Sequence, residues 1–152
     1  MKLKAVVLDI DGVILDTAFL FEEIHSLKLK GDAMWDYFHE NCNSDKVHLI
    51  EGFYSLYLNL FDMKVHSDVE FILLTSRNEK VRKQTEKKLR EESIFYDRLY
   101  MRPNTDYREA SILKQETLKI LQKEYRILLF IDDDLKNCEA AKELGIYTMR
   151  KV

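Results

Sequence analysis

The feature that most constrains this chain is a short apolar run that ends in two carboxylates, Lys4-Ala5-Val6-Val7-Leu8-Asp9-Ile10-Asp11-Gly12-Val13. The run is apolar from Ala5 to Leu8, as in a central parallel strand that helices cover on both faces. Asp9 and Asp11 then place two anions close together at the carboxyl end of a strand, where open α/β sheets bind ligands. They repel each other unless a proton or a cation compensates them. Such oxygen ligands suit Mg²⁺, although Asp-x-Asp-Gly is also common in turns.

Length and composition favour one globular domain that spans residues 1–152. The chain is 46% hydrophobic and 34% charged, with a net charge of −3, which predicts no general affinity for nucleic acid or acidic membranes. Cys42 and Cys138 lie far apart, as expected for two reduced thiols. No apolar run reaches membrane-spanning length, and Asp9 and Asp11 interrupt the first apolar stretch too early for a signal peptide. We therefore expect a cytoplasmic protein.

Apolar runs and helical patterns alternate along most of the chain. Strands are expected at about 5–8, 69–74, 97–101, 126–131 and 146–149, with helices between them. This order predicts an α/β, Rossmann-like three-layer sandwich, in which a parallel five-stranded sheet has helices on both faces and right-handed crossovers.

A helical insert rich in aromatic residues is expected after the first strand, at about 17–64. Asp32 is expected to cap a short helix that carries Met34, Trp35 and Phe38. The aromatic residues either pack against the sheet or form a small lid over Asp9. The four histidines of the chain are scattered without metal-ligand spacing, which argues against a zinc site.

Two further strands end in polar clusters. Thr75-Ser76-Arg77 follows the second long strand, and Asp132-Asp133 follows the fourth, while Lys114 lies near the start of a helix. Taken singly, these are ordinary helix caps or a solvated lysine. If the first strand is central and these two strands flank it, all the clusters meet at one crevice. Four carboxylates there require a divalent cation, and Lys114 adds the positive charge that a phosphate needs.

These motifs resemble those of the haloacid dehalogenase (HAD) superfamily, whose members are mostly phosphatases, over essentially the whole chain. Asp9-x-Asp11-Gly12-Val13 is similar to the first motif and Leu73-Leu74-Thr75-Ser76-Arg77 to the second. Lys114 fits the third motif, and Asp132-Asp133 with Asn137 fits the fourth. The order and the placement of the four motifs make this resemblance specific.

The second half of the chain also resembles the 3′-phosphatase domain of bacteriophage-type polynucleotide kinases. The similar segments are Thr75-Ser76-Arg77-Asn78-Glu79, the stretch from Met101 to Arg108, and Leu113-Lys114-Gln115-Glu116. The glycine-rich loop of the kinase part has no counterpart in this sequence. This closer likeness adds a phosphorylated nucleic acid 3′ end to the substrates to consider.

The superfamily resemblance implies a Mg²⁺-dependent phosphomonoesterase that works through an aspartyl-phosphate. It implies that Asp9 is the nucleophile and that Asp11 protonates the leaving oxygen and then activates water. The resemblance implies that Mg²⁺ is bound by Asp9, Asp132, Asp133 and the backbone carbonyl of Asp11, and that the phosphate is bound by Thr75, Ser76 and Lys114. Asn137 is expected to orient an acidic ligand or Lys114. The candidate contacts for the rest of the substrate are Arg77, Arg102 and Arg108.

Several substrates and two alternative functions remain open at this point. The substrate is a nucleotide, a nucleic acid 3′ end or a small phosphorylated metabolite. A non-catalytic phosphate-binding or scaffold domain is disfavoured, because both Asp9 and Asp11 are present. Phosphoryl transfer to an acceptor other than water, as in a mutase, is not excluded by these motifs, since they do not encode the acceptor.

Overall fold

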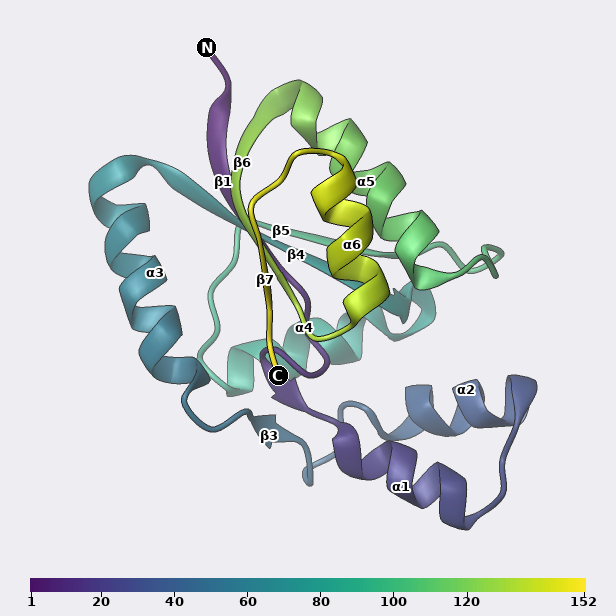
Figure 1. Cartoon of the computed structure of the whole chain (residues 1–152). Coiled ribbons are helices and arrows are strands. Elements are labelled where there is room, and N and C mark those ends of the chain that lie inside the picture. Colours follow the sequence, from purple (N-terminus) through teal and green to yellow (C-terminus); the bar gives the residue numbers. More distant parts are fainter.

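The computed structural model describes residues 1–152, whose elements are labelled in Figure 1. The strands are β1 (Leu3–Leu8), β2 (Leu15–Asp16), β3 (His48–Leu49), β4 (Val69–Asn78), β5 (Arg98–Arg102), β6 (Tyr125–Asp132) and β7 (Thr148–Arg150). The helices are α1 (Ala18–Ser26), α2 (Gly31–Asn41), α3 (Phe53–Ser67), α4 (Arg82–Glu91), α5 (Ala110–Glu124) and α6 (Leu135–Glu143), and a short 3₁₀ turn, η1 (Glu79–Val81), precedes α4.

The main sheet has the strand order β5-β4-β1-β6-β7, and every neighbouring pair is parallel. The first strand is therefore central, between β4 and β6, as predicted. Because parallel strands end at one edge of a sheet, this order brings the polar ends of β1, β4 and β6 together.

Alternate residues of β1 face opposite layers of helices. Ala5 and Val7 belong to a buried cluster that includes residues of α5 and α6, whereas Val6 and Leu8 belong to the cluster that includes α3 and α4. Figure 1 shows α5 and α6 on one side of the strands and α3 on the other. The predicted three-layer α/β sandwich is confirmed, because an apolar central strand has to be covered on both faces.

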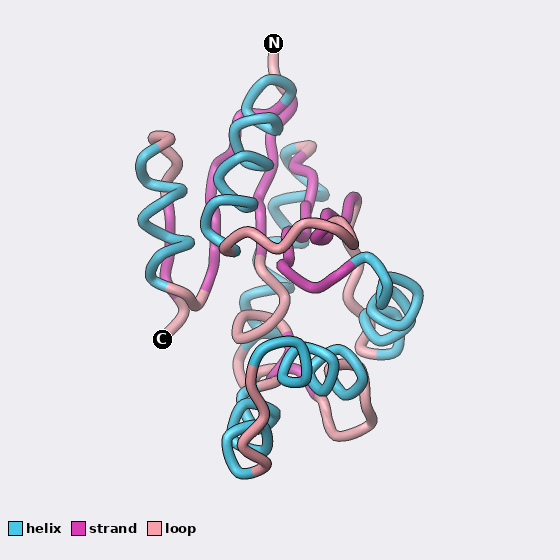
Figure 2. Tube along the Cα trace, turned by 90° about the vertical axis from the view of Figure 1, so that its right-hand side faces the viewer, coloured by secondary structure: helices cyan, strands magenta, loops and turns pink.

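The segment after β1 divides into two parts that pack against different elements. Helices α1 and α2 form a hairpin beyond the carboxyl edge of the sheet, around a small core of Leu20, Ile24, Phe38 and Cys42 (Figures 1 and 2). Helix α3 instead packs on the sheet, through residues that include Phe53. Of the two arrangements expected for the aromatic residues, packing against the sheet is thus present in α3, whereas α1 and α2 form a helical unit with a core of its own.

Local details differ from the sequence-based expectations. The expected cap at Asp32 is wrong: Lys30 occupies the N-cap of α2, no side chain caps it, and Asp32 lies in the first turn. Strand β4 continues through Asn78, beyond the expected end at residue 74. The antiparallel pair β2–β3 was not expected, because two residues per strand are too few to show a period.

None of the helices has both the length and the apolar character of a membrane span.

The contact between α5 and the sheet gives a first test. Leu118 is fully buried in the cluster with Ala5 and Val7, whereas Ile120 of the same helix is 61% exposed. We expect Leu118→Ala to lower the free energy of unfolding by about 3 kcal/mol, because it leaves a cavity. Ile120→Ala is the matched control, with an expected change within about 0.5 kcal/mol. Urea denaturation measures both, and equal effects would contradict this packing.

Candidate active site

A buried lysine joins the ends of two neighbouring strands. Asp9 follows β1, Asp132 ends β6, and Lys114 extends from the first turns of α5. The Lys114 Nζ lies 2.9 Å from Oδ1 of Asp9 and 2.7 Å from Oδ2 of Asp132. All three residues are buried, with 6% of Asp9, 2% of Lys114 and none of Asp132 exposed. The predicted meeting of these three residues is therefore present in the fold.

Burial and charge set the ionisation of this cluster. Burial by itself lowers the pKa of Lys114, but the carboxylates of Asp9 and Asp132 outweigh that effect and raise it, so the ammonium stays charged. Burial raises the pKa of Asp9 well above its usual range, against the opposing effect of Lys114, and the charges of Asp132 and Asp11 raise it further. Asp9 is therefore in a site with too much negative charge for a single lysine to balance.

Hydrogen bonds fix the carboxylate of Asp132 on all sides. The Nδ2 of Asn137 lies 3.2 Å and 3.1 Å from its two oxygens, and the backbone N–H of Asp134 donates to Oδ1 at 2.9 Å. With Lys114 on Oδ2, this buried carboxylate is fully satisfied. Asn137 thus contacts an acidic residue of the site, as the resemblance implied, and holds the acceptor that positions Lys114.

The side chains of Asp9, Asp132 and Asp133 form an acidic cluster. Each offers one carboxylate oxygen, and these oxygens lie within 4.8 Å of one another. Burial, and next the charge of Asp132, raise the pKa of Asp133 to about 6, although the residue as a whole is exposed to solvent. With Asp11, four carboxylates face the cations Lys114 and Arg77, which leaves two negative charges uncompensated when all are ionised. The donors fit a hard divalent cation in both charge and chemistry.

Gly12 allows Asp133 to approach the turn after β1. The φ angle of Gly12 is +80°, and a Cβ atom at this position would lie only 2.1 Å from Oδ2 of Asp133. Both the backbone conformation and the space therefore require glycine. The glycine of the Asp-x-Asp-Gly motif thus lets the side chain of Asp133 pack directly against the turn.

Arg77 binds the second carboxylate of the first motif. Its Nε and Nη2 donate to Oδ2 and Oδ1 of Asp11 at 2.9 Å and 2.7 Å, a bidentate pair. The hydroxyl of Thr17 also donates to Oδ1 of Asp11, at 3.1 Å. Asp11 is therefore held in one orientation, with 21% of its side chain exposed.

All five N–H donors of Arg77 are used within the protein. Besides Asp11, its Nη1 donates to Oδ1 of Asn43 (2.7 Å) and Oγ1 of Thr85 (3.2 Å), and its Nη2 donates to the carbonyl of Cys42 (3.1 Å). Only 1% of Arg77 is exposed. Arg77 thus has no donor left for a substrate, and the expected substrate contact is corrected to a buried support for Asp11.

Residues that sequence reasoning missed complete this support. Thr17, Asn43 and Thr85 all contact Asp11 or Arg77, and Asn43 also donates to Thr85 at 3.2 Å. Thr17 follows the first motif closely and was the one with a local signal. Asn43 comes from the loop after α2 and Thr85 from α4, and neither belongs to a recognisable motif.

The second motif, Thr75-Ser76-Arg77, lies near the end of β4. The Oγ1 of Thr75, 3% exposed, accepts from the backbone N–H of Arg77 at 3.1 Å, which leaves its own hydroxyl proton free to be donated. The carbonyl of Ser76 accepts from Nε of Arg102 at 3.2 Å. A hydroxyl donor of this kind suits a phosphoryl oxygen.

The other two candidate arginines are engaged mainly with the protein. Arg102 also donates to the carbonyls of Asp106 (3.0 Å) and Arg108 (2.6 Å), so it shapes the loop after β5. Arg108 pairs with Asp106 and Glu116 at 2.8 Å and 2.7 Å, and its side chain is 46% exposed. Of the three arginines, Arg108 is the one that the structure leaves open to solvent.

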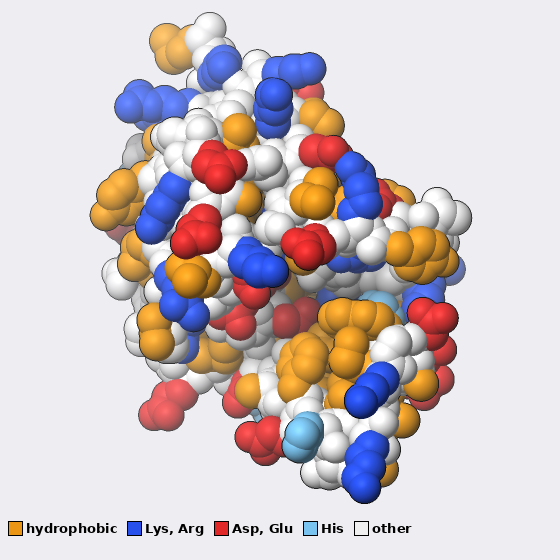
Figure 3. Space-filling model, turned by 45° about the vertical axis from the view of Figure 1, so that its right-hand side comes forward, with side chains coloured by type: hydrophobic (Ala, Val, Ile, Leu, Met, Phe, Trp, Pro, Cys, Tyr) orange, Lys and Arg blue, Asp and Glu red, His pale blue; other side chains and the backbone are white.

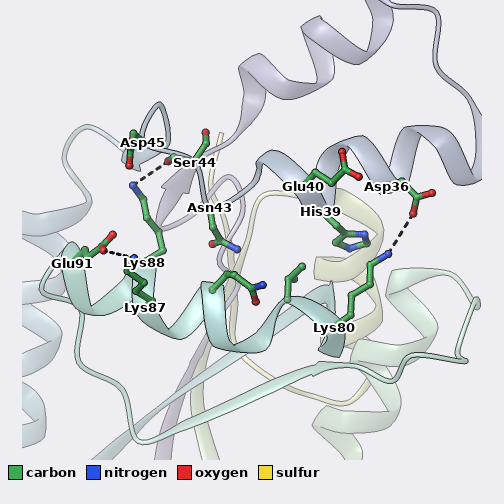
Figure 4. A pocket seen from close by; sticks show the side chains of 12 residues that line it. Asp36, His39, Glu40, Asn43, Ser44, Asp45, Lys80, Lys87, Lys88 and Glu91 are labelled. Atoms are coloured by element: carbon green, nitrogen blue, oxygen red, sulfur yellow. Dashed lines mark hydrogen bonds and ion pairs between the residues drawn. The ribbon is translucent and has the colours of Figure 1, made fainter.

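A pocket of about 510 Å³ lies beside the site, between α2 and α4 (Figure 4). Its walls include His39, Lys80 and Asn43, and Lys80 pairs with Asp36 at 3.3 Å across it. The acidic cluster of Asp9, Asp132 and Asp133 is not part of this pocket. The pocket therefore lies next to Asn43, which contacts Arg77, and not next to the carboxylates of the acidic cluster.

Residues 1–150 match the family model of HAD superfamily, subfamily IIIB (acid phosphatase). The chain belongs to this family. The description of that model names it as a family of acid phosphatases. No curated protein matches the chain by sequence.

Solved structures show the same fold. A chain in "Structure of the Pnkp1/Rnl/Hen1 RNA repair complex" is 24% identical with a TM-score of 0.73, and the match covers 98% of this chain and 42% of that one. The class C acid phosphatase from Bacillus anthracis with tungstate bound is 14% identical with a TM-score of 0.66, covering 100% and 69%. The chain thus spans less than half of the first of these relatives.

The buried pair of Arg77 and Asp11 gives a second test. Arg77→Lys keeps the charge but cannot make five hydrogen bonds, so we expect it to lower the free energy of unfolding by about 2 kcal/mol. Because Asp11 also loses its fixed orientation, we expect kcat for p-nitrophenyl phosphate to fall by about tenfold to a hundredfold. Arg90→Lys, at an exposed position of α4, is the control for both measurements. Normal stability and turnover in Arg77→Lys would contradict this role.

Proposed function

We propose that this chain is a Mg²⁺-dependent phosphomonoesterase that forms an aspartyl-phosphate on Asp9. The observation that carries the proposal is the environment of that carboxylate. Its Oδ1 pairs with Lys114, its Oδ2 has no hydrogen-bonding partner in the protein, and it lies in the acidic cluster with Asp132 and Asp133. One oxygen is thereby oriented and the other is free to attack phosphorus.

The proposed Mg²⁺ ligands are Asp9, Asp132, Asp133 and the backbone carbonyl of Asp11. A divalent cation at the acidic cluster would compensate the two remaining negative charges, and Mg²⁺ is typical of the family. When bound, the ion supplies positive charge that stabilises the phosphoryl oxygens. Asp132 already accepts hydrogen bonds from Lys114 and Asn137, so Asp9 and Asp133 are the side chains with most freedom to bind the ion.

In the first step, Oδ2 of Asp9 forms a bond to phosphorus while the bond between phosphorus and the leaving oxygen breaks. Asp11 gives its proton to that oxygen, which leaves as an alcohol. In the second step a water molecule attacks phosphorus, Asp11 takes the water proton, and the bond from phosphorus to Asp9 breaks. Inorganic phosphate and free Asp9 are the products, and Asp11 again carries its proton.

The remaining residues of the site bind charge and maintain orientation. Lys114 and the hydroxyl of Thr75 are proposed to contact the phosphoryl oxygens, together with groups of Ser76. Arg77 is proposed to act through Asp11, which it holds by two hydrogen bonds. Arg108 is the proposed contact for the rest of the substrate, because its side chain is half exposed.

We further propose that residues 1–152 form one hydrolase domain, with about 17–64 as its insert, that acts on a nucleotide or a nucleic acid 3′ end. Support comes from the resemblance to bacteriophage-type 3′-phosphatases in Thr75–Glu79, Met101–Arg108 and Leu113–Glu116. A likeness of fold to a chain of an RNA repair complex agrees with it. The loop after β5, which Arg102 and Asp106 organise, belongs to the second of these segments.

Substitution of the two carboxylates of the first motif tests the reaction. We expect Asp9→Asn to abolish Mg²⁺-dependent release of phosphate from p-nitrophenyl phosphate and from 3′-phosphorylated oligonucleotides. Asp11→Asn should slow turnover by about 10²–10⁴-fold and let the phosphorylated protein accumulate, visible by intact-mass spectrometry. Asp62→Asn, on the exposed side of α3, is the control. Full turnover by Asp9→Asn would refute the assigned nucleophile.

Two glycines with similar backbone angles test the metal site. A Cβ at Gly12 would meet Oδ2 of Asp133 at 2.1 Å, whereas a Cβ at Gly52, with φ +83°, would have nothing within 4 Å. Both alanine variants carry a similar backbone strain, so Gly52→Ala should lower stability by about 1 kcal/mol, and Gly12→Ala, which also meets Asp133, by more. Only Gly12→Ala displaces Asp133, and we expect Mg²⁺ affinity, measured by calorimetry, to fall at least about tenfold in it alone. Equal Mg²⁺ affinity in the two variants would count against Asp133 as a ligand.

A further inference from the structure

An arginine that belongs to none of the expected motifs lies beside the acidic cluster. Arg150 ends β7, which lies next to β6, and its partner in the register of the two strands is Asp132 (Figure 1). The backbone N–H of Lys151 donates to the carbonyl of Asp132 at 2.9 Å, which fixes the end of β7 at this edge of the sheet. Nε of Arg150 donates to the carbonyl of Asp133 at 3.2 Å. Arg150 is therefore attached directly to a residue of the cluster.

The guanidinium of Arg150 has donors that the protein does not use. The bond from Nε to Asp133 is the only hydrogen bond of this side chain, which is exposed, and it forms no ion pair. The N–H groups of both Nη1 and Nη2 are thus available to an acceptor from solution. A carboxylate or a phosphate group matches such a planar fork, because it can accept two parallel hydrogen bonds.

The other arginines at this edge of the sheet are committed to acceptors of the protein. Arg77 is buried and uses all of its donors. Arg108 forms ion pairs with two carboxylates of its own segment, and Arg102 is half-buried and donates to three backbone carbonyls. Arg150 alone among the four combines an exposed guanidinium with an unpaired charge.

The charge balance of the site leaves Arg150 available to an anion. Figure 3 shows acidic side chains in a hollow between the upper and the lower part of the molecule, with Lys and Arg side chains on the surface beside it. Within the site, Lys114, Arg77 and the proposed divalent cation together balance the four carboxylates described above. Arg150 therefore adds positive charge to a site whose own carboxylates are already compensated, and such an excess attracts an anionic ligand.

We propose that Arg150 binds a second anionic group of the substrate, beside the phosphate that is hydrolysed. The side chain of Asp133 belongs to the acidic cluster while its carbonyl holds Arg150, so the two anions lie on either side of this residue. The inference rests on the proposed function and deepens it, because it restricts the preferred substrates to phosphate esters with a second oxyanion near the ester. The internucleotide phosphate of a strand end and the carboxylate of a phosphorylated acid both supply this chemistry.

Matched pairs of substrates test the inference. Adenosine 3′,5′-bisphosphate and adenosine 3′-monophosphate differ by one phosphate, whereas 3-phosphoglycerate and glycerol 3-phosphate differ by one carboxylate. In at least one pair, we expect the wild-type chain to have the higher kcat/KM for the compound with the second anion. Arg150→Ala should lower that preference by about tenfold, mainly through KM, and Arg150→Lys, which keeps the charge without the fork, should retain part of it. The pair that responds shows whether the second anion is a phosphate or a carboxylate.

An arginine at the opposite edge of the sheet provides the matched control. Arg126 lies near the start of β6, is exposed, and forms no side-chain hydrogen bond or ion pair, so Arg126→Ala should leave the preference unchanged. If Arg150→Ala lowers kcat/KM equally for both members of each pair, Arg150 acts only by positioning Asp133, and the inference is overturned. The absence of any preference in the wild-type chain would also overturn it.

Binding to the Asp9→Asn variant supplies a measurement that does not require turnover. By calorimetry with Mg²⁺ present, we expect the compound with the second anion to bind about tenfold more tightly than its partner in at least one pair, and added Arg150→Ala to remove the difference. If the wild-type chain hydrolyses none of the four compounds but this difference is found, the proposed reaction fails and the second-anion site stands. If all four are hydrolysed with equal preference and bound with equal affinity, the site fails and the reaction stands.

Discussion

The ion pair of one lysine with two aspartates is the interaction on which this site depends. Lys114 is buried between Asp9 and Asp132, which end neighbouring parallel strands and would otherwise repel each other. A buried charge is tolerated only where it is paired and hydrogen-bonded, so this arrangement fixes where α5 begins relative to β1 and β6. Asn137 completes it from α6. Helices α5 and α6, which form one layer, thus each contribute a side chain to the site.

A second charge pair organises the other half of the site in the same way. Arg77, at the end of β4, binds Asp11 and is itself enclosed by Asn43, Thr85 and the carbonyl of Cys42. Each of the two aspartates of the first motif therefore has its own buried cation. Asp9 keeps one oxygen free and stands in excess negative charge, while Asp11 is held by donors on both oxygens. The two carboxylates of the first motif are therefore in different environments.

The sequence predicted the sheet and the meeting of the motifs because both follow from strong, regular signals. An apolar run such as Ala5–Leu8 is typical of a covered central strand, and the carboxyl ends of parallel strands share one edge. The support of Arg77 could not be predicted, because its partners come from a loop and a helix with no periodic relation to Asp11. For the same reason Arg77 was expected to contact the substrate, since only tertiary contacts reveal its burial.

The helical hairpin is the element whose role the sequence left most open, and its contacts narrow that role. Its end at Asn43 hydrogen-bonds to Arg77, and its start at Thr17 hydrogen-bonds to Asp11. His39 contacts the backbone at Asn78 between them. A lid that swung away as a rigid body would break all of these bonds and leave the buried charge of Arg77 without acceptors, which is costly. The hairpin is therefore a fixed wall of the site.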